Sequence, residues 1–306
     1  MGDIVVVGSI NMDLVIKVNR IPSPGETIIG GDIATIPGGK GANQAVAASK
    51  MDCSVSMVAR VGADAYGQGL LEQLGRNNVD TSRVITSQGV SSGTAVILVS
   101  REGQNSIVVS PGANGQVSNA DIQDSLEMIK QAKLVLLQHE IPIEVVAYTA
   151  ALAKQNGVKV ILNPAPVKDI PENFLINVNI LIPNQVEAEA LSGIPVVDIA
   201  SAKKAALKIQ QMGPETVIIT MGGQGASLLH REEFVYHPAL QVDVVDTTAA
   251  GDAFIAGFAS ALLHQVPIQE ALKFAIASGA LAVTKFGAQT SLPDYKSVMD
   301  LYKELG

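Results

Sequence analysis

The sequence predicts an α/β protein built on a doubly wound, mostly parallel sheet with helices on both faces. Short β-branched runs recur along the chain, and helical patterns lie between them. Strands that are apolar throughout and alternate with helices are typical of a parallel sheet covered on both faces. The expected strands are residues 4–7, 55–58, 134–138, 158–162, 180–182 and 217–220, and the expected helices are 41–51, 67–77, 143–156 and 201–212.

The composition indicates a globular chain with a large core. Of 306 residues, 47% are hydrophobic and 16% are charged, and 21 basic against 29 acidic residues give a formal charge of −8. No linker or repeat interrupts the chain, so we expect one domain over residues 1–306. Net acidity without a run of Lys or Arg argues against partners such as nucleic acid or an anionic membrane.

The N-terminus and the cysteine content favour a cytoplasmic protein. Residues 4–7 are too short an apolar run for a signal peptide, and a basic start is lacking. No apolar stretch approaches about 18 residues, so we expect no membrane-spanning helix. Cys53 is the only cysteine and therefore has no partner for an internal disulfide or a zinc cluster.

Four β-rich runs do not fit the strand–helix alternation. They are residues 9–17, 27–36, 93–99 and 106–110, the last two separated by Arg-Glu-Gly-Gln, which is typical of a hairpin. We expect a small antiparallel sheet that projects from the main domain as a lid or a dimer surface. This lid would comprise about 9–17, 27–37 and 92–110. An ordinary edge extension of the main sheet is the alternative.

Polar residues follow the carboxyl ends of the expected strands, where ligands bind in an open parallel sheet. They are Asn11, Asp13, Glu140, Asn163, Asn184, Glu187, residues 222–225 and, after a further run at 242–245, Asp246 and Asp252. Each alone could be a cap or turn former, but together they predict a ligand site. Familiar nucleotide motifs are absent from the sequence, because Gly8 opens no G-x-G-x-x-G and Gly41 stands where a P-loop has Ser or Thr.

The segment Val-Asp-Thr-Thr-Ala-Ala-Gly-Asp-Ala-Phe, residues 245–254, predicts an anion site with a base beside it. Ala249, Ala250 and Gly251 open a buried apolar helix expected at 249–264, which a second one at 268–284 follows. Their N–H groups can face a phosphate. Asp252 would repel that phosphate unless it takes the proton of an attacking hydroxyl group. The alternative is that Asp252 only complements the helix dipole, although other residues can cap this helix, namely Asp246, Thr247 or Thr248.

A second informative segment is Pro-Gly-Gly-Lys-Gly-Ala-Asn-Gln-Ala, residues 37–45. Its glycines let the backbone approach a ligand closely, and Lys40 and Asn43 add donors where a helix begins. Such groups suit a polyhydroxylated ligand. A simple tight turn is the alternative.

Together these two segments resemble the two signatures of the ribokinase family, the PfkB-type sugar and nucleoside kinases. The resemblance extends to Asn11-Met12-Asp13, Asn163-Pro164-Ala165-Pro166, Asn184-Gln185-Val186-Glu187 and Gly287-Ala288-Gln289, in order from residue 4 to about 293. It implies a ribokinase-like fold with a small β-sheet lid that also forms a homodimer.

The resemblance also implies the roles of individual residues. The implied sugar contacts are Asn11, Met12, Asp13, Gly39, Lys40, Gly41, Ala42, Asn43 and Glu140, with Asp252 as catalytic base and Ala249, Ala250 and Gly251 as the anion hole. The implied ATP contacts are Asn184, Thr220, Met221, Gly222, Gly223, Gln224, Gly225, Gly251, Asp252 and Ile276. The implied metals are Mg²⁺, held by Glu187 through water, and K⁺, held by Asp246, Thr248, Ala282, Lys285, Gly287 and Ser291.

Within the family, the resemblance is strongest to the branch that phosphorylates the 5-hydroxyl of D-ribose with ATP, giving D-ribose 5-phosphate and ADP. A same-family kinase for another sugar or a nucleoside is the first alternative, although only 4% of the residues are aromatic and could stack on a base. A non-catalytic sugar sensor is the second, and Asp252 with its anion hole argues against it. His139 is expected to be a structural neighbour of Glu140.

Overall fold

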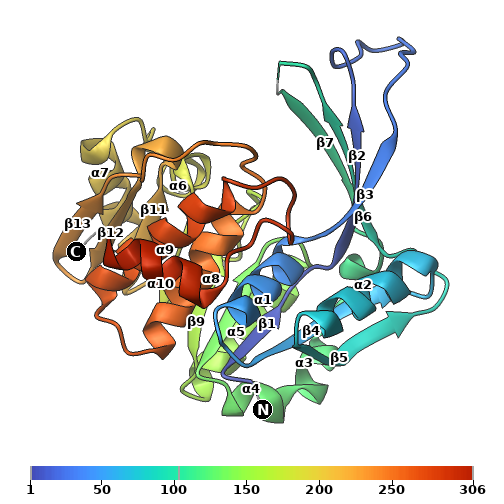
Figure 1. Cartoon of the computed structure of the whole chain (residues 1–306). Coiled ribbons are helices and arrows are strands. Elements are labelled where there is room, and N and C mark those ends of the chain that lie inside the picture. The colour runs from blue at the N-terminus through green and yellow to red at the C-terminus, as the bar shows by residue number, and fades with distance from the viewer. Residues whose placement is uncertain (1, 103, 305–306) are drawn as a thin grey trace.

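The computed structural model describes residues 2–102 and 104–304, and these form one large and one small sheet (Figure 1). The strand order of the large sheet is β13-β12-β11-β10-β9-β8-β1-β4-β5. Its strands are β1 (Ile4–Val7), β4 (Val55–Gly62), β5 (Val79–Ser87), β8 (Leu134–Gln138), β9 (Lys159–Asn163), β10 (Ile180–Leu181), β11 (Thr216–Thr220), β12 (Ala226–His230) and β13 (Glu233–His237). All pairs from β5 to β11 are parallel, and β12 and β13 add an antiparallel edge, so the predicted mostly parallel sheet is confirmed.

Helices cover both faces of this sheet, as predicted (Figure 1). One face carries α1 (Lys40–Lys50), α2 (Ala65–Arg76), α8 (Ala250–Leu263), α9 (Ile268–Ala282) and α10 (Tyr295–Lys303). The other carries α3 (Asn119–Asp124), α4 (Leu126–Gln131), α5 (Ile143–Gln155), α6 (Gln185–Ser192) and α7 (Ile199–Gln210). Because side chains alternate along a strand, Ile4 and Val6 enter the first core, and Val5 and Val7 enter the second. Of the helices in the described ranges, none is long and apolar enough to cross a membrane.

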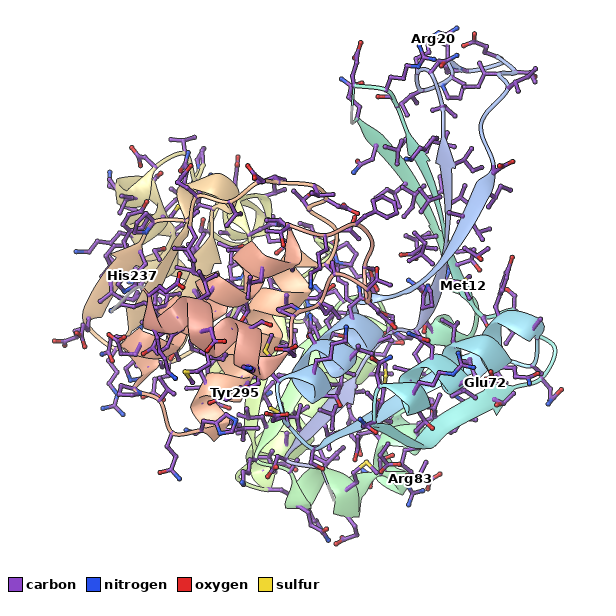
Figure 2. All side chains as sticks on the ribbon, viewed as in Figure 1. Met12, Arg20, Glu72, Arg83, His237 and Tyr295 are labelled. Atoms are coloured by element: carbon purple, nitrogen blue, oxygen red, sulfur yellow. The ribbon has the colours of Figure 1, made fainter. Side chains whose placement is uncertain are left out.

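The small sheet projects from one end of the molecule as the predicted lid (Figure 1). Its strands are β2 (Asn11–Lys17), β3 (Ile33–Gly38), β6 (Gly93–Val99) and β7 (Asn105–Ser110), in the order β3-β2-β6-β7. In Figure 2, Met12 lies where the lid joins the domain and Arg20 lies at the far end. The turn expected between β6 and β7 includes Gly103, which lies outside the described residues, as do the ends of the predicted domain at Met1, Leu305 and Gly306.

Two expectations about the lid are wrong. The sheet is mixed rather than antiparallel, because β2 pairs in parallel with β6 while the other pairs are antiparallel. Both strands leave the base of the domain in the same direction, one after β1 and the other after β5. The strand expected from residue 27 begins only at Ile33. Gly30 and Gly31, which lack the side chains that stabilise strands, precede it.

The strand expected at residues 242–245 is also absent from the described chain. This segment lies in the connection between β13 and α8, where Val244 and Val245 are 63% and 60% exposed. The backbone N–H groups of Val245 and Asp246 instead donate to the carbonyl oxygen of Val283, at 2.8 and 3.2 Å. The connection is therefore fixed to the end of α9, which brings Asp246 close to residues 283–287.

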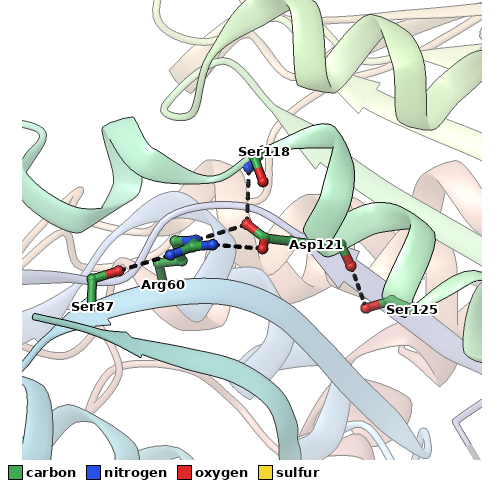
Figure 3. A network of polar contacts seen from close by, with 5 residues as sticks. All are labelled: Arg60, Ser87, Ser118, Asp121 and Ser125. Atoms are coloured by element: carbon green, nitrogen blue, oxygen red, sulfur yellow. Dashed lines mark hydrogen bonds and ion pairs between the residues drawn. The ribbon is translucent and has the colours of Figure 1, made fainter.

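An ion pair joins β4 to α3, the first α-helix after the lid strands (Figure 3). The Arg60 guanidinium group on β4 donates to both carboxylate oxygens of Asp121 on α3, each at 2.7 Å. Although burial opposes it, this pairing holds the pKa of Asp121 below its usual range. The 3₁₀ turn before α3, Gly112–Gln116, carries Asn114, whose Nδ2 donates to Asn11 Oδ1 at 2.7 Å. The first lid strand is thus tied to the point where the chain leaves the lid.

Candidate active site

A cavity of about 460 Å³ lies at the carboxyl ends of the central strands. Parallel strands bring these ends to one edge, so residues far apart in sequence meet there. Its lining includes nine of the sequence-predicted site residues: Lys40, Asn163, Asn184, Glu187, Thr220, Gly222, Ala249, Gly251 and Asp252. The lining also includes Ile255, which the sequence did not single out, and Thr247, which it named only as a possible helix cap.

Asp252 is a buried carboxylate with defined partners in this cavity. It lies in the first turn of α8 and is 5% exposed. Asn43 Nδ2 donates to Oδ2 and Gln44 Nε2 donates to Oδ1, both at 3.1 Å, and both donors come from α1. Burial raises the pKa of Asp252, and Lys40 and the two amides oppose that rise. A desolvated carboxylate beside a cation is suited to accept a proton from a ligand hydroxyl group.

The helix α8 begins without a side-chain cap. Its N-cap residue, Ala249, has φ 59° and ψ 8° and makes no capping hydrogen bond. The expected cap by residues 246–248 is therefore wrong, because Asp246 Oδ1 accepts from the backbone N–H and hydroxyl groups of Thr248 instead. Within the described chain, no acceptor faces the N–H groups of Gly251 and Asp252. Because both residues line the cavity, they offer donors and a positive dipole end to an anion.

Carboxylates gather on the lid side of Asp252. Glu140 Oε2 accepts from the hydroxyl group of Ser9 at 2.5 Å and from the backbone N–H of Lys40 at 2.9 Å. Burial, together with Glu140 and Asp252, raises the pKa of Asp13 to about 7. Burial disfavours the charge of Lys40, but Asp252, Glu140 and Glu187 outweigh it and raise the pKa of that ammonium group.

Two amides and a glycine complete this polar region. Because Asn43 donates its Nδ2 to Asp252, its Oδ1 is buried and has no hydrogen-bond partner among the described residues. A ligand hydroxyl group can donate to it. Asn11 is 3% exposed, and a Cβ atom on Gly39, where φ is 89°, would lie 2.8 Å from the Asn11 nitrogen. Only glycine therefore fits at the turn into α1. Gly41 is buried in α1, and the side chains of Met12 and Ala42 lie in the core, so only their backbones can face a ligand.

The residues expected at the ATP site are not all gathered in the main cavity. Thr220 and Gly222 line it, whereas Gly223 and Gln224 line a second cavity of about 520 Å³ with residues 197–200. The side chains of Met221 and Ile276 are buried in the two cores. At Gly225, where φ is +100°, a Cβ atom would lie 2.2 Å from the His237 carbonyl oxygen. This glycine therefore fixes the turn, and its expected ATP contact stays a prediction.

Asn184 and Glu187 form a reciprocal cap at the start of α6. Asn184 Oδ1 accepts from the Glu187 N–H at 2.9 Å, and the Asn184 N–H and Nδ2 groups donate to the Glu187 carboxylate at 2.8 and 2.9 Å. Each carboxylate oxygen keeps one lone pair for a further donor. These carboxylate oxygens can accept hydrogen bonds from the water molecules that Mg²⁺ retains, so Glu187 suits binding through water better than direct ligation. In the described ranges, no three His, Cys, Asp or Glu side chains are grouped to hold a metal ion.

The residues expected to hold K⁺ lie in two adjacent segments. Asp246 accepts from Thr248 through Oδ1 and from the Gly287 N–H through Oδ2 at 2.9 Å. Although burial opposes it, these bonds hold the pKa of Asp246 below its usual value. The Lys285 N–H donates to the Ala282 carbonyl at 3.4 Å, and Ser291 donates its hydroxyl group to the Ala288 carbonyl at 2.8 Å. An ionised carboxylate among turn carbonyls suits a monovalent cation, so the residues fit the expected site.

Sequence reasoning missed three residues that contact this machinery: Ser9, Gln44 and Gln138. The signal was present for Gln44, which follows Asn43 in the glycine-rich segment. His139 Nδ1 lies 3.3 Å from the Pro166 carbonyl oxygen, and burial lowers the pKa of this imidazole to about 4. These contacts agree with its expected structural role.

The sequence matches the pfkB family of carbohydrate kinases over residues 1–295. The chain therefore belongs to the pfkB family of carbohydrate kinases, as its two signatures predicted. It is 39% identical to the ribokinase of Haemophilus influenzae over 96% of both chains. It is also 36% identical to the deoxyribokinase of Salmonella typhi over 95% of both chains. Its structure matches that of Arabidopsis thaliana ribokinase complexed with ribose and ATP, with a TM-score of 0.91, 36% identity and 99% of both chains covered.

Proposed function

We propose that this carbohydrate kinase transfers the γ-phosphoryl group of ATP to the 5-hydroxyl of D-ribose, giving D-ribose 5-phosphate and ADP. The observation that carries the proposal is the position of Asp252, buried in the cavity beside the uncapped start of α8. The similarity to proteins named ribokinase, one of them complexed with ribose and ATP, supports the choice of substrates.

In this mechanism Asp252 takes the proton of the sugar hydroxyl group as its oxygen attacks the γ-phosphorus. The bond between that phosphorus and the β–γ bridging oxygen breaks, and ADP leaves. The N–H groups of Gly251 and Asp252 and the Lys40 ammonium group stabilise the charge on the transferring phosphoryl group. The sugar hydroxyls are held by acceptors and donors on the lid side, namely Asn11, Asp13, Asn43 and Glu140.

Both expected metal ions have residues that could hold them. Glu187 would bind Mg²⁺ through water. The proposed K⁺ ligands are Asp246, Thr248, Ala282, Lys285, Gly287 and Ser291. The two cations would offset the negative charge of the nucleotide phosphates. The chain's own contribution is to keep the Asp246 and Glu187 carboxylates oriented by the hydrogen bonds described above.

The lid has two roles in this proposal. Closed over the sugar, it would exclude water and so limit wasteful hydrolysis of ATP. Its outer strand β7 exposes three consecutive apolar residues, Ile107, Val108 and Val109, which are 51%, 68% and 50% exposed. An exposed apolar strand is suited to pair with a second copy, so we propose a homodimer through the lid.

The test is ADP release from ATP and Mg²⁺ with D-ribose, 2-deoxyribose, fructose, adenosine or 2-keto-3-deoxygluconate, each with and without K⁺. We expect ribose to give the fastest turnover and K⁺ to increase it. Faster turnover with 2-deoxyribose would assign the activity of the deoxyribokinase relative instead. Ribose binding without ADP release would favour a sugar sensor.

Gly251→Ala should separate activity from stability. A Cβ atom at Gly251 would meet no protein atom within 4 Å and would project beside the cavity. The methyl group would obstruct the anion site, so we expect kcat to fall by about 10-fold or more. The same change should stabilise α8 by about 0.5–1 kcal/mol, because alanine favours a helix more than glycine does. Steady-state kinetics and urea unfolding measure the two effects.

The matched control is Gly69→Ala in the exposed part of α2, where a Cβ atom would also meet no neighbour. It should give a similar stabilisation with the kcat of the unchanged protein. Equal kcat values for the two variants would contradict the anion site.

A further inference from the structure

A chain of buried amides leads away from Asp252 into the protein. Gln138, the last residue of β8, donates its Nε2 to Gln44 Oε1 at 2.7 Å. Gln44 in turn donates its own Nε2 to Asp252 Oδ1 at 3.1 Å. Both glutamines have 0% exposure, and neither lines the cavity. They therefore have no route to a ligand except through Asp252.

We propose that Gln44 and Gln138 are positioning residues, with Gln138 holding the Gln44 amide so that its Nε2 group faces the Asp252 carboxylate. The proposal rests on the proposed function, in which Asp252 is the base.

The reason lies in the near-symmetry of an amide group. Rotated by half a turn, Gln44 would present its oxygen to Asp252, which is repulsive while the carboxylate is ionised but favourable when it is protonated. In that rotated state, Gln44 Nε2 would face Gln138 Nε2, and two donors cannot bond to each other. With its Nε2 group facing Gln44, as in this structure, Gln138 therefore favours the Gln44 orientation that stabilises the ionised base.

The Gln138 side chain carries a feature that lowers stability. Its Oε1 is buried and has no hydrogen-bond partner among the described residues. An unsatisfied buried acceptor is destabilising, and an apolar side chain would avoid that penalty. Room for the amide also requires a residue without a side chain, because a Cβ atom on Gly8 would lie 2.1 Å from Gln138 Oε1.

Other charged groups also face Asp252, and they stay in place when the glutamines are changed. Lys40 lies on α1, Glu140 follows β8, Glu187 lies on α6 and Asp13 lies on β2. A change in the pH profile that appears only when an amide is removed can therefore be assigned to the amide chain.

The test is the dependence of kcat on pH for Gln138→Met, with ATP and D-ribose as substrates. Without the Gln138 donor, the Gln44 amide is free to rotate, so the ionised carboxylate loses a donor and the pKa of Asp252 rises. We expect the acidic limb of the profile to move up by about one pH unit. On that limb kcat should fall by about 10-fold, recover at higher pH, and leave the KM for ribose nearly unchanged.

A double-mutant cycle distinguishes an effect of the Gln138–Gln44 amide chain from a general packing effect. Gln44→Met should shift the limb at least as far, and Gln138→Met should add nothing in that background. If Gln138→Met folds poorly, the same pH profile is measured on Gln138→Leu, with thermal unfolding and ribose binding as checks that this variant is folded. The matched control is Thr149→Val, which removes another fully buried hydrogen bond, to the Val145 carbonyl, on the opposite face of the sheet. It should lower stability without moving the limb.

An unmoved acidic limb in a folded Gln138→Met protein would overturn the proposal. A further shift of the limb when Gln138→Met is added to Gln44→Met would also overturn it. If Asp252→Asn is inactive while the limb is unmoved, the base assignment stands and only the amide chain fails. If Asp252→Asn is fully active, the base assignment fails, and the role of the two glutamines fails with it.

Discussion

Replacing Asp252 with Asn is expected to lower kcat for D-ribose by about 10²–10⁴-fold while leaving ribose binding largely intact. Asparagine keeps the shape, and its oxygen can still accept from one of the two donors, Asn43 or Gln44, but it cannot take the proton of the sugar hydroxyl group. The N–H groups at the start of α8 remain, so a residual rate is expected. Single-turnover measurement of ADP formation gives the rate, and calorimetry gives the affinity for ribose.

The control for this variant is Asp294→Asn. Asp294 caps α10 by accepting from the Ser297 N–H at 2.7 Å, and asparagine can replace it in that cap. Its kcat should equal that of the unchanged protein. An unchanged kcat for Asp252→Asn would exclude Asp252 as the base, whereas loss of ribose affinity with the usual kcat would make it a binding residue.

The main sheet could be predicted because its strands are buried on both faces and therefore apolar throughout. The strand at residues 134–138 has the predicted bounds, and α8 begins and ends within one residue of expectation. The run at 242–245 contains three valines, yet it lies in a connection where Val244 and Val245 are exposed. Local pattern does not say whether a neighbouring strand exists. The parallel pairing of β2 with β6 likewise depends on where the chain re-enters the lid, which no local pattern encodes.

The site was predictable where one segment carries several functional groups. The glycine-rich turn before α1 and the start of α8 each combine backbone donors with a polar side chain, and the fold places them together at Asp252. The amide chain was not predictable in the same way. Gln138 and Gln44 are 94 residues apart, and Gln44 and Asp252 are 208 apart. A polar residue at the end of a strand is also a common turn former, so it gives no sign of such a role.

The carboxylates that we propose as sugar ligands should also destabilise the site when no sugar is bound. Asp13 lies against Gly38, where a Cβ atom would be 2.2 Å from the Asp13 Oδ2 atom. It is partly desolvated and faces both Glu140 and Asp252, which together raise its pKa to about 7. Above about pH 7 Asp13 therefore carries its charge beside Glu140 and Asp252, whereas Lys40 interacts with Glu140 and Asp252. Sugar hydroxyl groups would donate to these oxygens and relieve their mutual repulsion.

Asp13→Asn should accordingly weaken ribose binding and stabilise the ligand-free protein. Loss of charged hydrogen bonds to the sugar should lower the affinity by about 10²-fold. In the native protein, a folded pKa of about 7 against an unfolded value of 3.8 means that the proton on Asp13 stabilises the fold at low pH. That stabilisation is lost as pH rises through about 7. Asparagine has no such proton to lose, so the free energy of unfolding of the variant should exceed that of the unchanged protein by up to about 4 kcal/mol at pH 8.

The pH dependence of this difference is the decisive part of the measurement. Urea unfolding at pH 5 and pH 8 without ligand should give a stability gain at pH 8 that falls to less than half at pH 5. At pH 5 Asp13 is protonated in the folded protein, and only its ionisation in the unfolded chain, with a pKa of 3.8, still lowers stability. Asp294→Asn is again the control, because Asp294 lies at an exposed helix start and its pKa is held low by the Ser297 N–H. A gain of equal size at both pH values would mean that Asp13 is not repelled by its neighbours. Unchanged ribose affinity would exclude Asp13 as a sugar ligand, because we expect the Asp13 carboxylate to affect both ribose binding and stability.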